Sequence, residues 1–184
     1  MKNKIIILVI AVISITVVSV LLFNNYQRNK GQSAEETGGV SASMLLAQAK
    51  EFESKGDLPE ERAAYQKLVN QFVSSPDIAK WQKKLEDLNI KLLFSPIVTA
   101  QSELYEIKPG DTLVKIAKQF NTTVELISKS NNLSSDRIIP GRKIKVWKAP
   151  FTIFVDKSQN VLLLKTAEEV FKTYIVSTGK DNCT

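Results

Sequence analysis

The chain has 184 residues and a formal net charge of +6, with no histidine and a single cysteine, Cys183. This length is sufficient for one mid-sized domain or two small ones. The composition excludes histidine-based metal sites, Ser-His or Cys-His relays and an internal disulfide within these residues. We therefore expect no catalytic residue, no metal ligand set and no cofactor. The sequence also lacks a phosphate-binding loop and a nucleic-acid recognition motif, so a nucleic-acid partner is not expected.

Residues 5–23, IIILVIAVISITVVSVLLF, carry no charge. The segment is nearly as long as a helix that crosses a bilayer, which needs about 20 residues. No small-x-small cleavage site follows, so we expect an uncleaved transmembrane anchor after a cytoplasmic stub at 1–4; a cleaved signal peptide is the alternative. Lys2 and Lys4 precede the span, which places the N-terminus inside and the bulk of the chain in the periplasm or cell-wall space.

Residues 24–41 are polar and glycine-containing, which is typical of a flexible linker. Residues 42–94 show helical periodicity. Gly56 is expected to end a first helix and Pro59 to open a second one. The apolar stripe of the first helix is Leu45, Ala49 and Phe52, and that of the second is Tyr65, Leu68, Val69 and Phe72. A third helix follows, with the apolar stripe Ile78, Trp81, Leu85, Leu88 and Leu92.

Ser75 and Pro76 are expected to cap and open the third helix. The run KGDLPEERAAYQKLVNQFVSSP within this segment resembles one tetratricopeptide unit. It departs from that repeat at Glu61, where the repeat has a small residue, and at Val73, where it has a proline. A plain helical spacer is the simpler interpretation, and recruitment of a protein partner is an alternative role.

Residues 104–148 follow a second linker, 95–103, and predict a strand, two helices and a strand. The second strand, Lys143 to Trp147, is expected to alternate between its two faces. The expected helix caps and stops are Asp111 or Thr112, Asn121, Thr122 or Thr123, and Asn131 with Asn132. The expected inward-facing helix residues are Leu113, Ile116, Ala117, Phe120, Val124, Ile127 and Leu126.

The motifs YEIKPGDTLVKIAKQF, NNL and IIPGRKIKV occur here in order, and the segment resembles the LysM module. The resemblance implies a βααβ fold that binds N-acetylglucosamine-containing glycan, here peptidoglycan, in a shallow groove between two loops. Gly110 lets the backbone approach a sugar, amides at the helix start can bond an acetamide carbonyl, and Leu113 and Ile139 could cover apolar sugar faces. Turn and cap formation explains some of these residue types equally well. The implied glycan-binding candidates are Gly110, Asp111, Thr112, Leu113, Leu133, Ile138, Ile139 and Pro140.

Residues 151–176 predict three antiparallel strands, FTIFV, VLLLK and VFKTYIV. The runs VDKSQNVLLL and YIVSTGKDNCT resemble the start of a YkuD-type L,D-transpeptidase domain, here 151–184. That family attacks a peptide stem with a cysteine of a Ser/Thr-x-Gly-Cys motif, which this sequence lacks. Cys183 is therefore expected to be an ordinary loop cysteine, and the chain as given is expected to have no transpeptidase activity.

These observations predict a multidomain α+β chain with a transmembrane anchor, a helical spacer, a βααβ LysM module and an antiparallel β meander that is part of an incomplete domain. The predicted function is membrane-anchored peptidoglycan binding, in the N-terminal part of an L,D-transpeptidase that cross-links peptidoglycan stems. A complete, non-enzymatic cell-wall-binding anchor or scaffold protein is the alternative.

Overall fold

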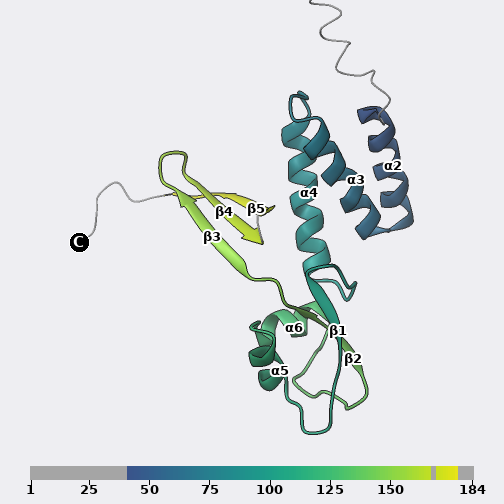
Figure 1. Cartoon of the computed structure of the whole chain (residues 1–184), viewed down its shortest axis with the longest axis vertical. Helices are drawn as coiled ribbons and strands as arrows, with labels where there is room; N and C mark the ends of the chain where they lie inside the picture. Colours follow the sequence, from purple (N-terminus) through teal and green to yellow (C-terminus); the bar gives the residue numbers. More distant parts are fainter. Residues whose placement is uncertain (1–40, 167–168, 178–184) are drawn as a thin grey trace, which may run out of the picture. The chain divides into compact units, whose positions relative to one another are not determined.

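The computed structural model describes residues 41–166 and 169–177. Mixed helices and antiparallel strands follow one another along the chain (Figure 1). The predicted anchor at 5–23, the linker up to residue 40 and Cys183 lie outside the described residues. Within the described ranges, no helix has the length and apolar character needed to cross a membrane. The helices are α2 (Ala42–Lys55), α3 (Leu58–Gln71), α4 (Ile78–Leu93), α5 (Leu113–Gln119) and α6 (Val124–Ser130), and the strands are β1 (Ser102–Glu106), β2 (Lys143–Trp147), β3 (Phe151–Asp156), β4 (Val161–Thr166) and β5 (Glu169–Ile175).

Helices α2, α3 and α4 form where the apolar spacing predicts them. Gly56 has a positive φ of 70° directly after α2, which is the left-handed stop expected of a glycine. Asp57 caps α3 by accepting a hydrogen bond from the Glu60 amide. The predicted cap of α4 is wrong: the helix begins at Ile78, after a turn in which the Ser75 carbonyl accepts from the Ile78 amide.

Glu61, which departs from the tetratricopeptide pattern, is buried and only 2% exposed. Its Oε1 lies 3.1 Å from the Nζ of Lys84 on α4. The same ammonium lies 2.6 Å from Glu53 on α2, so one lysine pairs with carboxylates of both other helices. Lys84 thereby provides the partner that a buried carboxylate requires.

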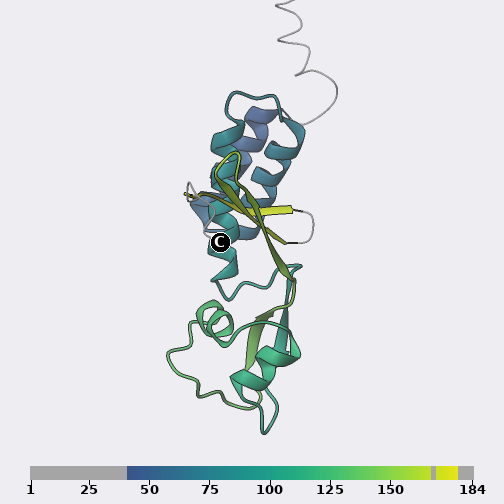
Figure 2. The same ribbon diagram turned by 90° about the vertical axis from the view of Figure 1, so that its left-hand side faces the viewer.

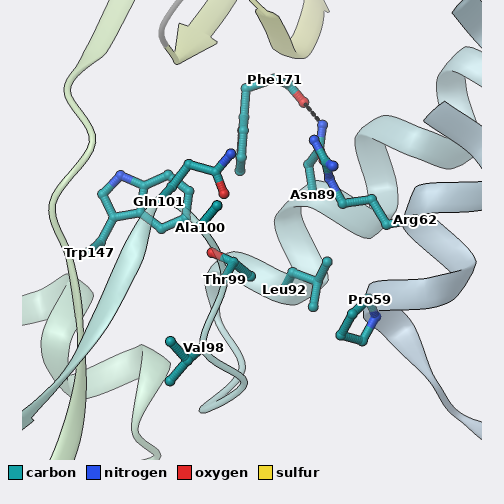
Figure 3. Close-up of a pocket in the computed structure, with 10 residues that line it drawn as sticks. All are labelled: Pro59, Arg62, Asn89, Leu92, Val98, Thr99, Ala100, Gln101, Trp147 and Phe171. Carbon is teal, nitrogen blue, oxygen red and sulfur yellow. Dashed lines mark hydrogen bonds between the residues drawn. The ribbon is translucent and has the colours of Figure 1, made fainter.

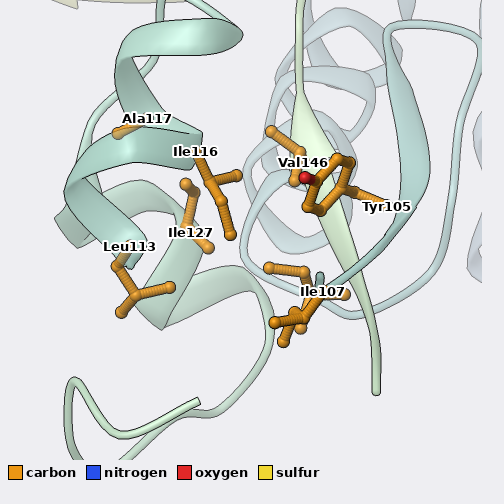
Figure 4. Close-up of a cluster of buried hydrophobic side chains, with 8 residues drawn as sticks. Tyr105, Ile107, Leu113, Ile116, Ala117, Ile127 and Val146 are labelled. Atoms are coloured by element: carbon orange, nitrogen blue, oxygen red, sulfur yellow. The ribbon is translucent and has the colours of Figure 1, made fainter. Parts of the chain in front are cut away.

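The LysM segment forms the predicted βααβ unit. β1 and β2 pair antiparallel, from Ser102 opposite Trp147 to Glu106 opposite Lys143. Figure 4 shows side chains of α5 and α6 facing those of the two strands. β1 begins at Ser102, so it starts within the stretch 95–103 that was expected to be a linker. The buried core consists of Tyr105, Ile107, Leu113, Ile116, Ala117, Ile127, Ile144 and Val146.

Both short helices of this unit begin and end by the predicted chemistry. Thr112 and Thr123 are the N-caps, each accepting from an amide three residues on. Asn121 and Asn132 follow the helices with φ of 51° and 52°. The amide two residues beyond each C-cap returns to a carbonyl of the last turn, which closes both helices in Schellman motifs.

The Asn131 side chain closes the free edge of β2. Its Oδ1 accepts from the Lys145 amide at 2.7 Å, and its Nδ2 donates to the Lys145 carbonyl at 2.7 Å. The Nδ2 group also donates to the carbonyl of Ile127 at 2.8 Å. Asn131 therefore supplies the hydrogen bonds that a further strand would make with β2.

The residues of β2 alternate between its two faces as predicted, Ile144 and Val146 on one and Lys145 and Trp147 on the other, but both faces are buried. Lys145 is 1% exposed, and its Nζ donates to the carbonyls of Leu92 at 2.6 Å and Ser95 at 2.9 Å. These carbonyls lie at the C-terminal end of α4, where a cation is favourable. Burial lowers the pKa of Lys145 from 10.5 to about 8.

The last three strands form the predicted antiparallel meander in the order β3-β4-β5. β5 lies beside α4 (Figures 1 and 2), where Thr173 donates to Glu86 at 2.7 Å and Lys172 to Asp87 at 2.7 Å. A second buried cluster joins Leu93 of α4, Trp147 of β2 and Phe171 of β5. Leu126, expected to face the LysM core, packs against this second cluster instead.

Candidate functional site

The candidate glycan site lies at the end of the two-stranded sheet where β1 ends and β2 begins. The first loop, residues 107–112, follows β1, and the second loop, residues 133–142, precedes β2. The Ile107 amide donates to the Arg142 carbonyl at 3.0 Å, and the Gly141 amide donates to the Ile107 carbonyl at 2.8 Å. These two bonds continue the β ladder and hold the loops against each other.

The first loop is braced by Asp111, which is not the helix cap. Its Oδ2 accepts from the Tyr105 hydroxyl at 2.9 Å and from the Lys108 amide at 2.8 Å. These hydrogen bonds, the Lys108 amide first and Tyr105 second, lower the pKa of Asp111, so it stays ionised near neutral pH. Gly110 has φ of 84°, and its carbonyl accepts from the Lys115 ammonium at 2.8 Å. The loop is thus fixed before any ligand binds.

The second loop ends in a tight turn. Gly141 has φ of 85°, a conformation that a side chain would strain, and the Arg142 amide donates to the Ile139 carbonyl at 3.2 Å. Ile139 is 67% exposed, whereas Leu133 and Ile138 are half-buried against the LysM core. Ile139 therefore presents an apolar side chain to solvent from a turn that the backbone holds in place.

The candidate residues thus differ in what they can offer a sugar. Leu113 is 2% exposed and belongs to the core, so its side chain cannot cover a sugar face as the sequence suggested. Thr112 is the helix cap, and Asp111 is occupied by the loop. The exposed members are Gly110, Thr112, Ile139 and Pro140. Sequence analysis missed Ile107 and Arg142, whose backbone groups join the loops, and Tyr105, whose hydroxyl bonds Asp111, because these contacts depend on strand register and packing.

A separate cavity of about 210 Å³ lies where α3, α4, β2 and β5 meet (Figure 3). Two of its polar side chains bond each other or the backbone: Arg62 Nε donates to Asn89 Oδ1 at 2.6 Å, and Asn89 Nδ2 donates to the Phe171 carbonyl at 3.0 Å. The volume is below the about 300 Å³ of small ligand pockets. We interpret it as a packing junction. Among the residues that the structure describes, no group of three or more acidic, histidine or cysteine side chains could hold a metal ion.

Comparison with known proteins identifies the segment that carries the two loops. Residues 105–147 match the LysM domain family and are a LysM domain, as the motifs predicted. The chain is 43% identical over 77 residues to the cell wall-binding protein YocH of Bacillus subtilis, covering 40% of this chain and 27% of that protein. It is 42% identical over 53 residues to the probable endopeptidase p60 of Listeria welshimeri, covering 29% of this chain and 10% of that protein.

A further relative belongs to another class of protein, the L,D-transpeptidases. The chain is 30% identical over 84 residues to the putative L,D-transpeptidase YkuD of Bacillus licheniformis, covering 42% of this chain and 51% of that protein. The chain therefore spans only part of each of these three relatives, at most about half of its length. No solved structure matches the chain.

Proposed function

We propose that the LysM domain binds the N-acetylglucosamine-containing glycan of peptidoglycan between its first and second loops. The observation that carries this proposal is the pair of backbone bonds from Ile107 to Gly141 and Arg142, which fixes both loops at one end of the sheet. The similarity to YocH, whose name describes it as cell wall-binding, supports the ligand class. Ile139 offers its exposed apolar side chain to a sugar face, and Gly110 leaves space above its backbone.

Replacement of Ile139 by alanine should weaken co-sedimentation of the full chain with insoluble peptidoglycan by about tenfold, since most of one exposed apolar contact is lost. Leu104→Ala is the matched control, because Leu104 is 54% exposed on β1 and away from the loops. The control should bind like the parent chain. The proposal fails if the parent chain stays in the supernatant at low and high salt alike, or if both variants bind equally.

We further propose that residues 5–23 anchor the chain in the cell membrane, with the bulk of the chain in the periplasm or cell-wall space. The support is their uncharged apolar sequence and the lysines that precede it. The full chain should fractionate with membranes and be digested by protease added outside the cell, and a variant without 5–23 should leave the membrane fraction. Membrane association that survives the deletion would contradict this assignment.

The segment 151–177 leads us to propose a link to L,D-transpeptidation, in which this chain supplies the wall-targeting part. The support is the partial identity to the putative L,D-transpeptidase YkuD and the VDKSQNVLLL run. The gene sequence beyond the codon for Thr184 tests this link. An open frame with a histidine and a Ser/Thr-x-Gly-Cys motif supports it, and a stop codon at that point favours a non-enzymatic wall-binding protein.

A further inference from the structure

The three-helix segment carries a groove of about 400 Å³ that no sequence motif indicated. Residues of α2, α3 and α4 line it, and its volume lies within the about 300–1,000 Å³ of ligand sites. Two of its charged residues are already paired: Lys84 with Glu53 and Glu61, and Asp87 with Lys172 at 2.7 Å. These pairs hold the walls of the groove rather than a ligand.

The other charged groups of the lining remain available to a ligand. The side-chain ammonium groups of Lys50 on α2 and of Lys80 and Lys83 on α4 form no hydrogen bond and no close ion pair in the described ranges. Lys50 and Lys83 lie near enough to Glu53 and Asp87, respectively, to contribute to the lowered pKa of those carboxylates. Asp77, at the start of α4, makes no side-chain cap hydrogen bond. The groove therefore presents three ammonium groups and one carboxylate that form no close ion pair among the described residues. A complementary ligand carries several carboxylates and at least one amine.

Two aromatic residues of the lining add apolar surface and hydrogen-bonding groups to these charges. Tyr65 is 7% and Trp81 is 5% exposed, yet neither the hydroxyl nor the indole N–H has a hydrogen-bond partner in the part of the chain that the structure describes. Neither atom is sealed in the interior, so each meets solvent where its residue lines the groove. Both groups can therefore form a hydrogen bond with a ligand that enters the groove.

We propose that this groove binds the peptide stem of peptidoglycan. The stem is a short peptide with free carboxylates, the amine of a diamino acid and alanine methyl groups. The lysines would take its carboxylates, Asp77 its amine, and Tyr65 and Trp81 its peptide groups and methyl groups. This inference rests on the proposed wall-binding function, and it adds a second ligand to the glycan. Two linked weak sites on one polymer would strengthen wall binding by raising the effective concentration of each.

The test is calorimetric titration of the full chain, in detergent, with a sugar-free stem tetrapeptide at neutral pH. The parent chain should bind, and Lys80→Gln and Lys83→Gln should each weaken binding by about tenfold, since each removes a charge-assisted hydrogen bond. Tyr65→Phe should weaken it about fivefold without loss of packing. Lys67→Gln is the matched control, because Lys67 is an exposed lysine of α3 outside the groove, and it should bind like the parent.

Three further outcomes decide the assignment. A tetrapeptide with amidated carboxylates should lose most of the affinity. Absence of tetrapeptide binding by the parent chain, or equal binding by the Lys80 and Lys67 variants, would overturn the proposal. Equal binding of an acidic peptide of ordinary L-residues would also overturn the stem assignment. Peptide-free glycan strands, titrated in parallel, report on the LysM loops alone, so failure of one site is distinguishable from failure of the other.

Discussion

The chain should become more stable, by about 2 kcal/mol, as the pH rises from about 7.5 to about 9.5. The cause is Lys145, whose ammonium is buried against the end of α4 with carbonyl partners and, among the described residues, no carboxylate partner. In the unfolded chain Lys145 keeps its proton up to its ordinary pKa of 10.5, whereas in the folded chain it releases the proton at about pH 8. Between these values the unfolded state binds more protons, so the free energy of unfolding increases with pH.

Urea unfolding at a series of pH values measures this effect. The window ends below the range of Tyr65 and Lys84, whose pKa values are raised by burial and by the hydrogen bond with Glu53, respectively. Lys145→Met is the control, because methionine has a similar length and cannot titrate. Its stability should not rise through this window. A flat profile for the parent chain, or the same rise in the variant, would contradict a buried ammonium at this position.

Replacement of Asn131 by alanine should reduce the free energy of unfolding by about 2–4 kcal/mol. The variant loses both hydrogen bonds to the backbone of Lys145 and leaves that amide and carbonyl unpaired at the edge of β2. Trp147 lies two residues further along the strand, so its fluorescence reports the loss directly.

The neighbouring asparagine provides the control for this prediction. Asn132 is exposed and has φ of 52°, a conformation that glycine adopts freely, so Asn132→Gly should leave the unfolding midpoint nearly unchanged. If Asn131→Ala unfolds at the same urea concentration as the parent, the account of β2 edge closure is incorrect.

The sequence predicted those features that depend on local chemistry. Thr123 caps a helix because its own side chain accepts a hydrogen bond from a free backbone amide. Asn132 ends a helix because asparagine tolerates the positive φ that the stop requires. The two candidate loops could be placed together because β1 and β2 must pair, which brings the end of one strand to the start of the other.

Features that depend on distant packing could not be predicted in this way. The pattern of β2 assumes that one face of the strand meets solvent, but α4 covers that face and buries Lys145. Leu113 was predicted both to face the core and to cover a sugar face, and only the packing shows that the core takes its side chain. The groove of the helical segment combines Lys50 of α2 with lysines of α4, and only the packing of the three helices brings them together.

The most direct test of the central claim is an NMR titration of the isotope-labelled chain with an N-acetylglucosamine oligosaccharide. The account predicts that the largest amide shift changes fall in the first loop, 107–112, and the second loop, 133–142, with Gly110 and Ile139 among them. Absence of shift changes at millimolar oligosaccharide, or changes confined to the meander or the helical segment, would contradict glycan binding by these loops.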